Sequence, residues 1–129
     1  MRVSAGRPAA TSRQRLGRAG EDAAVEALRA GGYRILARNV RLRGGELDVV
    51  AEDAGTIVFV EVKARRSRAF GTPAEAVGPR KQRTLCHLAL RYLAGRRLGD
   101  RPCRFDVVEV WVDSAGALRA GMLRDAFRP

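Results

Sequence analysis

GELDVVAEDAGTIVFVEVK, residues 45–63 of this 129-residue chain, has the pattern of two β-strands joined by a tight turn. Residues 56–64 are rich in β-branched side chains, which favour a strand, and residues 46–52 form a second strand candidate before them. Asp53-Ala54-Gly55, between the two, is typical of a turn. The stretch therefore predicts a β-hairpin.

The hairpin would bring charged side chains together. If Ala54-Gly55 forms a two-residue loop, the numbers of residues that face one another across the strands sum to 109. Asp48 then faces Glu61, and Glu46 faces Lys63, with facing Cβ atoms about 4.5–5.5 Å apart. The register depends on the turn, because a slip of one residue would change every pair.

Alternation along a strand also predicts which side chains share a face. In the first strand, we expect Asp48 and Val50 on one face and Leu47, Val49 and Ala51 on the other. In the second strand, apolar residues occupy both faces, so its acidic residue is expected to be shielded from solvent.

Two facing carboxylates are unfavourable, because like charges directly opposite destabilise a ladder. A partly buried pair of this kind needs a compensating cation. Lys63 supplies one, and a divalent ion is another, since Mg²⁺ prefers oxygen ligands. The alternative interpretation is a buried salt-bridge network of Glu46, Asp48, Glu61 and Lys63.

The chain as a whole is strongly basic, with 25 Lys and Arg residues against 14 Asp and Glu residues and a formal net charge of +11. Such a field attracts polyanions, namely DNA, RNA or an acidic membrane surface, and nucleic acid is the partner that we expect. A solvated basic surface and a ribosome-associated protein are the alternatives. Two of the cations are lysines, Lys63 and Lys81. Because ammonium is a more compact charge than guanidinium, a lysine at position 63 suggests a site that needs the compact group.

Periodicity and turn residues predict one mixed α/β domain. Ser12 is expected to cap a helix that Gly31-Gly32 ends. Outside the hairpin, the predicted elements are helices over 13–30 and 79–97 and strands over 33–40, 104–112 and, at an edge, 117–127. The step from the strand 56–64 through the second helix to the next strand is long enough for a parallel crossover. We expect residues 1–11 to be disordered and residues 12–129 to form the single domain.

Two classes of protein are not expected. No segment approaches the roughly 20 apolar residues of a membrane span, and residues 1–16 lack the apolar core of a signal peptide, which predicts a cytoplasmic protein without a membrane partner. Cys86 and Cys103 form no CxxC pair, so buried, reduced thiols are expected. With His87 as the only histidine, zinc chemistry is not expected either.

A cationic patch is predicted around the start of the second helix, where the helix dipole disfavours cations and favours anions such as phosphate. A basic loop over residues 65–78 precedes that helix. Six side chains are therefore predicted to contact a nucleic-acid backbone: Arg65, Arg66, Arg68, Arg80, Lys81 and Arg83. A solvated run of charges is the alternative.

These residues carry a resemblance to known proteins. GELDVV (45–50) and VFVEVK (58–63) resemble the D…ExK signature of the PD-(D/E)XK nuclease superfamily, with Leu47 in place of its usual proline. Over about residues 13–112 the chain resembles the YraN family, small bacterial proteins similar to archaeal Holliday-junction resolvases. The supporting matches are Gly20-Glu21, Asn39, Phe70-Gly71, Pro73, Glu75-Ala76-Val77, Lys81 and Arg104–Val108.

The resemblance implies a restriction-endonuclease-like core with the order α-β-β-β-α-β. It implies that Asp48 and Glu61 bind Mg²⁺ or Mn²⁺, and that Lys63 orients the attacking water or stabilises the developing charge. Glu21 would match the first-helix acid of the resolvases as a further metal ligand, with an ordinary helix-flank acid as the alternative. Glu46 would support Lys63 or join the metal shell.

The implied function is a divalent-metal-dependent endonuclease that acts on DNA, branched or structured DNA in particular, and the implied assembly is a homodimer. The alternative is a non-catalytic nucleic-acid-binding or scaffold protein that keeps a nuclease-like fold. The sequence favours catalysis, because carboxylates that face a phosphate would repel DNA in the absence of a metal.

Overall fold

The computed structural model describes residues 12–66 and 77–128. The elements follow in the order α1 (Ser12–Ala30), β1 (Arg34–Leu42), β2 (Gly45–Asp53), β3 (Thr56–Arg65), α2 (Pro79–Gly95), β4 (Cys103–Val112) and β5 (Leu118–Phe127). The predicted α/β class and the order of elements are confirmed, and the last segment forms the expected edge strand. The predicted disorder of residues 1–11 lies outside the described residues.

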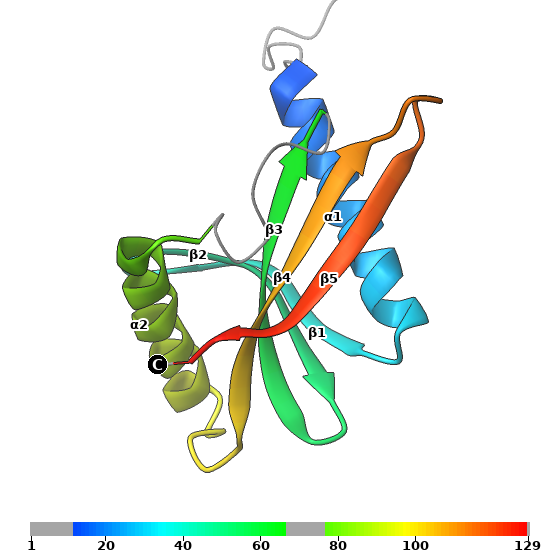
Figure 1. The fold of residues 1–129 in the computed structure, drawn as a ribbon. Helices are drawn as coiled ribbons and strands as arrows, with labels where there is room; N and C mark the ends of the chain where they lie inside the picture. The colour runs from blue at the N-terminus through cyan, green and yellow to red at the C-terminus, as the bar shows by residue number, and fades with distance from the viewer. Residues whose placement is uncertain (1–11, 67–76, 129) are drawn as a thin grey trace, which may run out of the picture.

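The strands form one mixed sheet in the order β1-β2-β3-β4-β5 (Figure 1). Neighbouring strands are antiparallel except β3 and β4, which are parallel. Because α2 lies in the connection between these two strands, the predicted parallel crossover is confirmed. The hairpin of β2 and β3 therefore reaches the middle of the sheet, with β3 as the central strand.

The two helices pack on opposite faces of the sheet (Figure 1). Leu28 of α1 belongs to a core that contains Val58, and we call this the α1 core. Leu88 of α2 belongs to a core that contains the next strand residue, Phe59, and we call this the α2 core. Burying a side chain of this size contributes about 1.5–3 kcal/mol. Both helices are thus held against the strand that carries the predicted site.

α1 packs tightly against β3 at Gly20. A Cβ atom at position 20 would lie 2.7 Å from the Cβ atom of Ala64, so this approach requires a glycine. Ala64 directly follows Lys63 in β3. The contact therefore brings the turn of α1 that carries Glu21 to the end of β3 at which Lys63 lies.

Alternation along β2 differs from the prediction at one residue. Val49 and Ala51 belong to the α1 core and Val50 to the α2 core, as expected. Leu47 also belongs to the α2 core, so its predicted place with Val49 is wrong. Asn39 of β1 lies between the ladder partners of these two residues and has a left-handed φ of 52°. Extended backbone does not continue through such a φ, so the two-residue alternation is interrupted at this level.

The remaining expectations concern thiols and membranes. Cys86 and Cys103 are free and half-buried, and burial raises the pKa of both thiols. The two thiols are free, as predicted, but they are only partly buried, whereas full burial was expected. Among the residues that the structure describes, no helix is long and apolar enough to cross a membrane.

Candidate active site

The turn between β2 and β3 has the predicted two-residue loop. Ala54 and Gly55 have φ angles of 49° and 91°, and a type I′ hairpin requires positive φ at both positions. The ladder pairs extend from this turn to Val49 and Val60, all in the predicted register. Beyond that pair, a side chain takes over the hydrogen bonding between the strands.

Next to the last ladder pair, the side chain of Asp48 bridges β2 and β3. Its Oδ2 accepts a hydrogen bond of 2.9 Å from the backbone N–H of Val62. This bond holds the carboxylate against β3, beside the carboxyl group of Glu61. Burial, and next the hydrogen bond with Glu61, raise the pKa of Asp48 from its ordinary value to about 7. Asp48 therefore retains its proton up to neutral pH.

Glu61 is the buried member of the pair, with 5% of its side chain exposed. Lys63 Nζ lies 3.6 Å from Glu61 Oε2, and Lys81 Nζ lies 3.4 Å from the same oxygen. Lys63 comes from β3 itself, whereas Lys81 comes from the first turn of α2. We call Asp48, Glu61, Lys63 and Lys81 the acid–lysine site.

Glu46 lies at the margin of this site. Its Oε2 is 3.4 Å from Arg41 Nε, and Arg41 is its ladder partner in β1. The ladder between β2 and β3 stops before the position at which Glu46 would face Lys63. In the described structure Glu46 is therefore joined to β1, and not to β3 as an extension of the predicted register implies.

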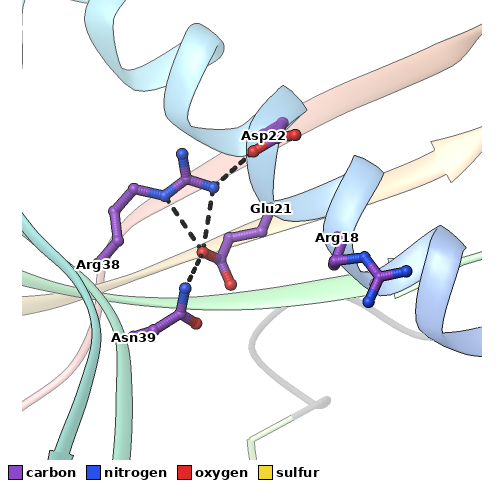
Figure 2. Close-up of a pocket in the computed structure, with 6 residues that line it drawn as sticks. Arg18, Glu21, Asp22, Arg38 and Asn39 are labelled. Carbon is purple, nitrogen blue, oxygen red and sulfur yellow. Dashed lines mark hydrogen bonds and ion pairs between the residues drawn. The ribbon is translucent and has the colours of Figure 1, made fainter. Parts of the chain in front are cut away.

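Glu21 lies in another group of charged residues, between α1 and β1 (Figure 2). Its Oε1 accepts hydrogen bonds from Arg38 Nη2 at 3.1 Å and from Asn39 Nδ2 at 2.9 Å. Arg38 also donates to Asp22 at 2.6 Å. Together with Arg18, these side chains line a hollow of about 400 Å³. The charge of Glu21 is thus balanced by an arginine from β1.

The two carboxylates of the acid–lysine site fit a divalent ion. Asp48 and Glu61 offer the oxygen ligands that Mg²⁺ and Mn²⁺ prefer, with water to complete the shell. The raised pKa of Asp48 means that the pair holds its full negative charge poorly in the protein alone, and a divalent ion would offset that charge. Within residues 12–66 and 77–128, no third acid, histidine or cysteine joins such a group, so Glu21 stands outside the pair.

The predicted cationic patch faces solvent where the structure describes it. Arg66, Arg80 and Arg83 are exposed and Arg65 is half-buried, whereas Arg68 lies outside the described residues. The first turn of α2 contains no acidic residue that would offset these charges. A surface of this kind suits the phosphates of a nucleic-acid backbone.

Lys81 is the site residue that local sequence patterns do not identify. Its neighbours in the chain group it with the arginines of the cationic patch, but the structure places its ammonium group on Glu61. The rarity of lysine was the available signal: the chain has two lysines among 25 basic residues, and both meet the same carboxylate.

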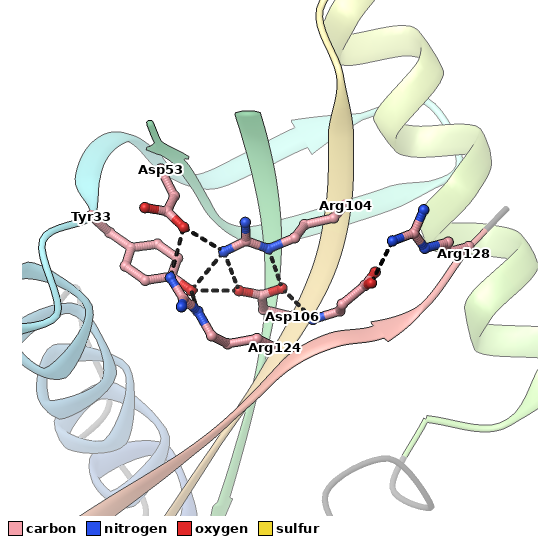
Figure 3. Close-up of polar contacts among 7 residues, drawn as sticks. Tyr33, Asp53, Arg104, Asp106, Arg124 and Arg128 are labelled. Carbon is pink, nitrogen blue, oxygen red and sulfur yellow. Dashed lines mark hydrogen bonds and ion pairs between the residues drawn. The ribbon is translucent and has the colours of Figure 1, made fainter. Parts of the chain in front are cut away.

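A second charged network ties the segment between α1 and β1 to the end of β2, to β4 and to β5 (Figure 3). Asp106 is fully buried and accepts hydrogen bonds from Tyr33 Oη at 2.8 Å and Arg104 Nε at 3.0 Å. Arg104 and Arg124 both donate to Asp53 Oδ2, at 2.9 and 2.7 Å. Arginine balances the charge of each of these two acids, so we assign the network to the stability of the fold.

The raised pKa of Asp48 predicts how stability depends on pH. An acid whose folded pKa lies above its unfolded value stabilises the fold below the unfolded pKa, near 4, and loses that contribution as pH rises through about 7. We expect Asp48→Asn to be more stable than wild type by about 1–3 kcal/mol at pH 8 in EDTA, with the difference shrinking toward pH 5. Asparagine can still accept the Val62 N–H. Urea unfolding of both proteins across this pH range measures the effect, and an equal pH dependence in both would contradict it.

Comparison with known proteins gives one consistent result. The model of "Uncharacterised protein family UPF0102" matches residues 20–110, a range that contains the whole acid–lysine site. A UPF0102 protein of Symbiobacterium thermophilum is 58% identical over 116 residues, which cover 88% of this chain and 97% of the relative. A UPF0102 protein of Moorella thermoacetica is 52% identical over 102 residues (79% and 85%), and one of Syntrophus aciditrophicus is 47% identical over 117 residues (91% and 91%).

Proposed function

The chain belongs to the uncharacterised protein family UPF0102, the YraN family that its motifs resemble, and we propose that it is a divalent-metal-dependent endonuclease acting on DNA. The acid–lysine site carries this proposal. Its two acids lie side by side, the pKa of Asp48 is raised, and two ammonium groups meet the carboxylate of Glu61. Binding of a polyanion alone would not require two acids, because acids repel phosphate.

The proposed reaction is hydrolysis of a phosphodiester bond. A water oxygen attacks phosphorus, the bond from phosphorus to the leaving ester oxygen breaks, and the leaving oxygen takes up a proton. One water is thus consumed for each cut. A divalent ion held by Asp48 and Glu61 would lower the pKa of bound water and offset negative charge on the phosphate. Lys63, two residues after Glu61, would hold a fixed positive charge beside the reacting group.

The arrangement of the elements supports a core of the PD-(D/E)XK type. The two acids stand on adjacent antiparallel strands, where the ladder of β2 and β3 ends. The lysine of the predicted signature follows on the same strand as Glu61. Helices cover both faces of the mixed sheet (Figure 1), and Asp48 needs no preceding proline to reach its place.

The charge of the chain supports nucleic acid as the substrate. The net charge is +11, and the exposed Arg66, Arg80 and Arg83 belong to the segments before and within α2, the helix that also supplies Lys81. DNA, branched or structured DNA in particular, is the substrate that we propose, and a homodimer is the proposed assembly.

The alternative function is that of a non-catalytic nucleic-acid-binding or scaffold protein. One observation favours it: the Val62 N–H and two lysines already offset part of the charge of the acid pair. In that case the four side chains would form a salt-bridge network that serves the fold. This alternative predicts DNA binding without cleavage and no specific response to divalent ions.

A cleavage assay separates the two functions. Purified protein would be incubated with linear duplex, single-stranded and four-way DNA, and with RNA, with either Mg²⁺, Mn²⁺ or EDTA. The nuclease proposal expects metal-dependent cuts that Asp48→Ala abolishes, which also rules out a contaminating nuclease. Binding of DNA without cleavage under all these conditions would support the scaffold alternative.

Divalent metal is expected to stabilise the protein through Asp48 and Glu61. At ten times a millimolar Kd, Mg²⁺ or Mn²⁺ should add about 1.4 kcal/mol, which raises Tm by roughly 4–8 °C in a domain of about 100 residues. Asp48→Ala should lose this rise, because one of the two carboxylate ligands is gone. Thermal unfolding with metal and with EDTA, together with calorimetry, tests the prediction. The same metal response in wild type and Asp48→Ala would contradict it.

DNA binding is expected to depend strongly on salt and little on sequence, because the cationic patch contains arginines rather than a base-reading motif. Replacing Arg65, Arg66 and Arg68 with alanine should reduce the slope of log K against log salt by about 2–3, since each phosphate contact contributes about 0.9. Filter binding or fluorescence anisotropy at several salt concentrations measures this slope.

A matched control removes the same net charge elsewhere. Arg34, Arg119 and Arg128 each pair with a surface acid in the described structure, and their triple alanine variant should change the slope by less than about 1. Equal slopes for the two triple variants would place the DNA contacts outside the cationic patch.

A further inference from the structure

We propose that Lys81 is a catalytic residue that contacts the scissile phosphate, and not one of the cations that bind the nucleic-acid backbone. The inference rests on the proposed nuclease function and assigns a second positive group to the same site. Its starting point is the position of one atom: Lys81 Nζ lies 3.4 Å from Glu61 Oε2.

The two lysines of the chain converge on that oxygen. Lys63 Nζ lies 3.6 Å from it, and no other lysine is present in the full sequence. Arginine supplies every other basic side chain except His87, including those next to Lys81 in the same turn. An ammonium group concentrates its charge on one nitrogen, so two of them fit around a single carboxylate oxygen more readily than two guanidinium forks. The choice of residue therefore matches the geometry of the site.

Lys81 is also far more exposed than the carboxylate that it contacts. Its side chain is 46% exposed, whereas that of Glu61 is 5% exposed. A phosphate that approaches the acid pair from solvent would reach an ammonium group at this position, and the favourable contact would offset repulsion by the two carboxylates. The exposed Arg80, one residue earlier, faces solvent and suits a more distant phosphate.

The first turn of α2 also favours a phosphate beside Lys81. Lys81 is the third residue of the helix, after Pro79 and Arg80, and the N-terminal end of a helix dipole favours anions. That turn contains no acidic residue. A phosphate oxygen beside Lys81 would therefore experience the helix dipole together with two ammonium groups that come from different elements, α2 and β3.

The test compares Lys81→Ala and Lys81→Met, which keeps most of the aliphatic stem, with Arg91→Ala. Arg91 is an exposed residue of the same helix outside the site, so its variant removes one positive charge without touching Glu61. In single-turnover cleavage at saturating protein, both Lys81 variants should be slower by about 10²-fold. Their DNA affinity should stay within about threefold of wild type, as expected for the loss of one charge among many. Arg91→Ala should cut DNA like wild type.

A metal titration without DNA gives an independent readout. Removing a cation that lies 3.4 Å from a ligand oxygen removes its repulsion of Mg²⁺ or Mn²⁺, so both Lys81 variants should bind these ions about three- to tenfold more tightly at pH 8. Arg91→Ala should bind them like wild type. Calorimetry measures both affinities, and melting temperatures verify that the variants are folded.

The outcomes separate this inference from the proposed function. If wild type cuts DNA and the Lys81 variants cut it at the same saturated rate, or bind metal with unchanged affinity, the role of Lys81 is overturned and the nuclease proposal stands. If wild type cuts no nucleic acid in Mg²⁺ or Mn²⁺, the nuclease proposal is overturned, and the role of Lys81 with it. Slow cleavage with retained DNA binding and tighter metal binding would support the assignment.

Discussion

Lys63→Ala is expected to lower the rate of DNA cleavage by roughly 10²–10³-fold, with DNA affinity close to that of wild type. The reason is the place of the ammonium group, 3.6 Å from the buried Glu61, where it would act on charge that develops at the reacting phosphate. A group of this kind contributes roughly 3–4 kcal/mol in other enzymes. Affinity should change little, because the variant removes one of 25 basic residues and none of the arginines of the cationic patch.

The structure helps to distinguish a catalytic role of Lys63 from a purely structural one. If Lys63 only balanced a buried acid, its removal would leave Glu61 without compensation and destabilise the fold. Lys81 lies on the same oxygen at 3.4 Å and would keep part of that compensation, so we expect Tm to fall by only a few degrees. Lys63→Arg should recover little activity, since the wider guanidinium does not fit the position of the ammonium group.

Cleavage, DNA affinity and Tm have to be measured on the same preparation of Lys63→Ala. Loss of cleavage with near-normal folding and binding would support a catalytic role. A variant that melts many degrees lower and regains cleavage at low temperature would instead assign Lys63 to the fold. Arg91→Ala provides the control for the loss of one positive charge at an exposed position.

The hairpin was predictable because its signals are local. Ala54-Gly55 permits the positive φ angles of a tight turn, and this turn sets the register up to Val49 and Val60. The proximity of Asp48 and Glu61 follows directly from that register. The helix boundaries and the parallel crossover were likewise predictable, from the apolar periodicity, the turn residues and the length of the connection.

The contacts beyond the ladder were not predictable in the same way. Asp48 leaves the regular pairing and bonds to Val62 N, and Glu46 turns to Arg41 of β1. The side of the sheet on which Leu47 packs depends on a left-handed φ at Asn39 in the neighbouring strand. Each of these features depends on an interaction between strands, which alternation within one strand does not contain.

Lys81 and Asp106 show most clearly which contacts the sequence pattern does not predict. Lys81 reaches Glu61 from a helix twenty residues away in the sequence, and Asp106 bonds to Tyr33 across 73 residues. Residues that flank either position give no sign of these partners. The acid Glu109, 1% exposed, is similarly hidden in a strand whose sequence is dominated by valine. Buried polar residues in otherwise apolar strands are therefore the features that the sequence pattern leaves without an assigned role.

Asp106→Ala is expected to destabilise the protein by about 3–5 kcal/mol. The carboxylate is fully buried and accepts hydrogen bonds from Tyr33 Oη, from Arg104 and from the backbone N–H of Asp125, at 2.8, 3.0 and 2.8 Å (Figure 3). Alanine would leave these donors without their acceptor and Arg104 with one acid, Asp53, in place of two. The loss is large because a buried donor that has lost its partner has no water to replace it.

Two further variants separate the network from its individual charges. Asp106→Asn keeps an acceptor of similar shape but loses the charge, so it should lower the free energy of unfolding by less than Asp106→Ala does. Arg124→Ala should cost only about 0–1 kcal/mol, because its side chain is 57% exposed and its ion pair with Asp53 is screened by solvent. Urea unfolding of the three variants at one pH gives the free energies directly.

Metal binding by Asp106→Asn tests whether the network belongs to the fold or to the active site. Phe105 and Val107 lie in the α2 core, so the side chain between them, that of Asp106, lies toward the α1 core, to which its partner Tyr33 belongs. Under conditions in which Asp106→Asn remains folded, it should therefore bind Mg²⁺ or Mn²⁺ like wild type, since Asp48 and Glu61 are untouched. A variant of normal stability that has lost metal binding would contradict this division and would make Asp106 part of the functional site.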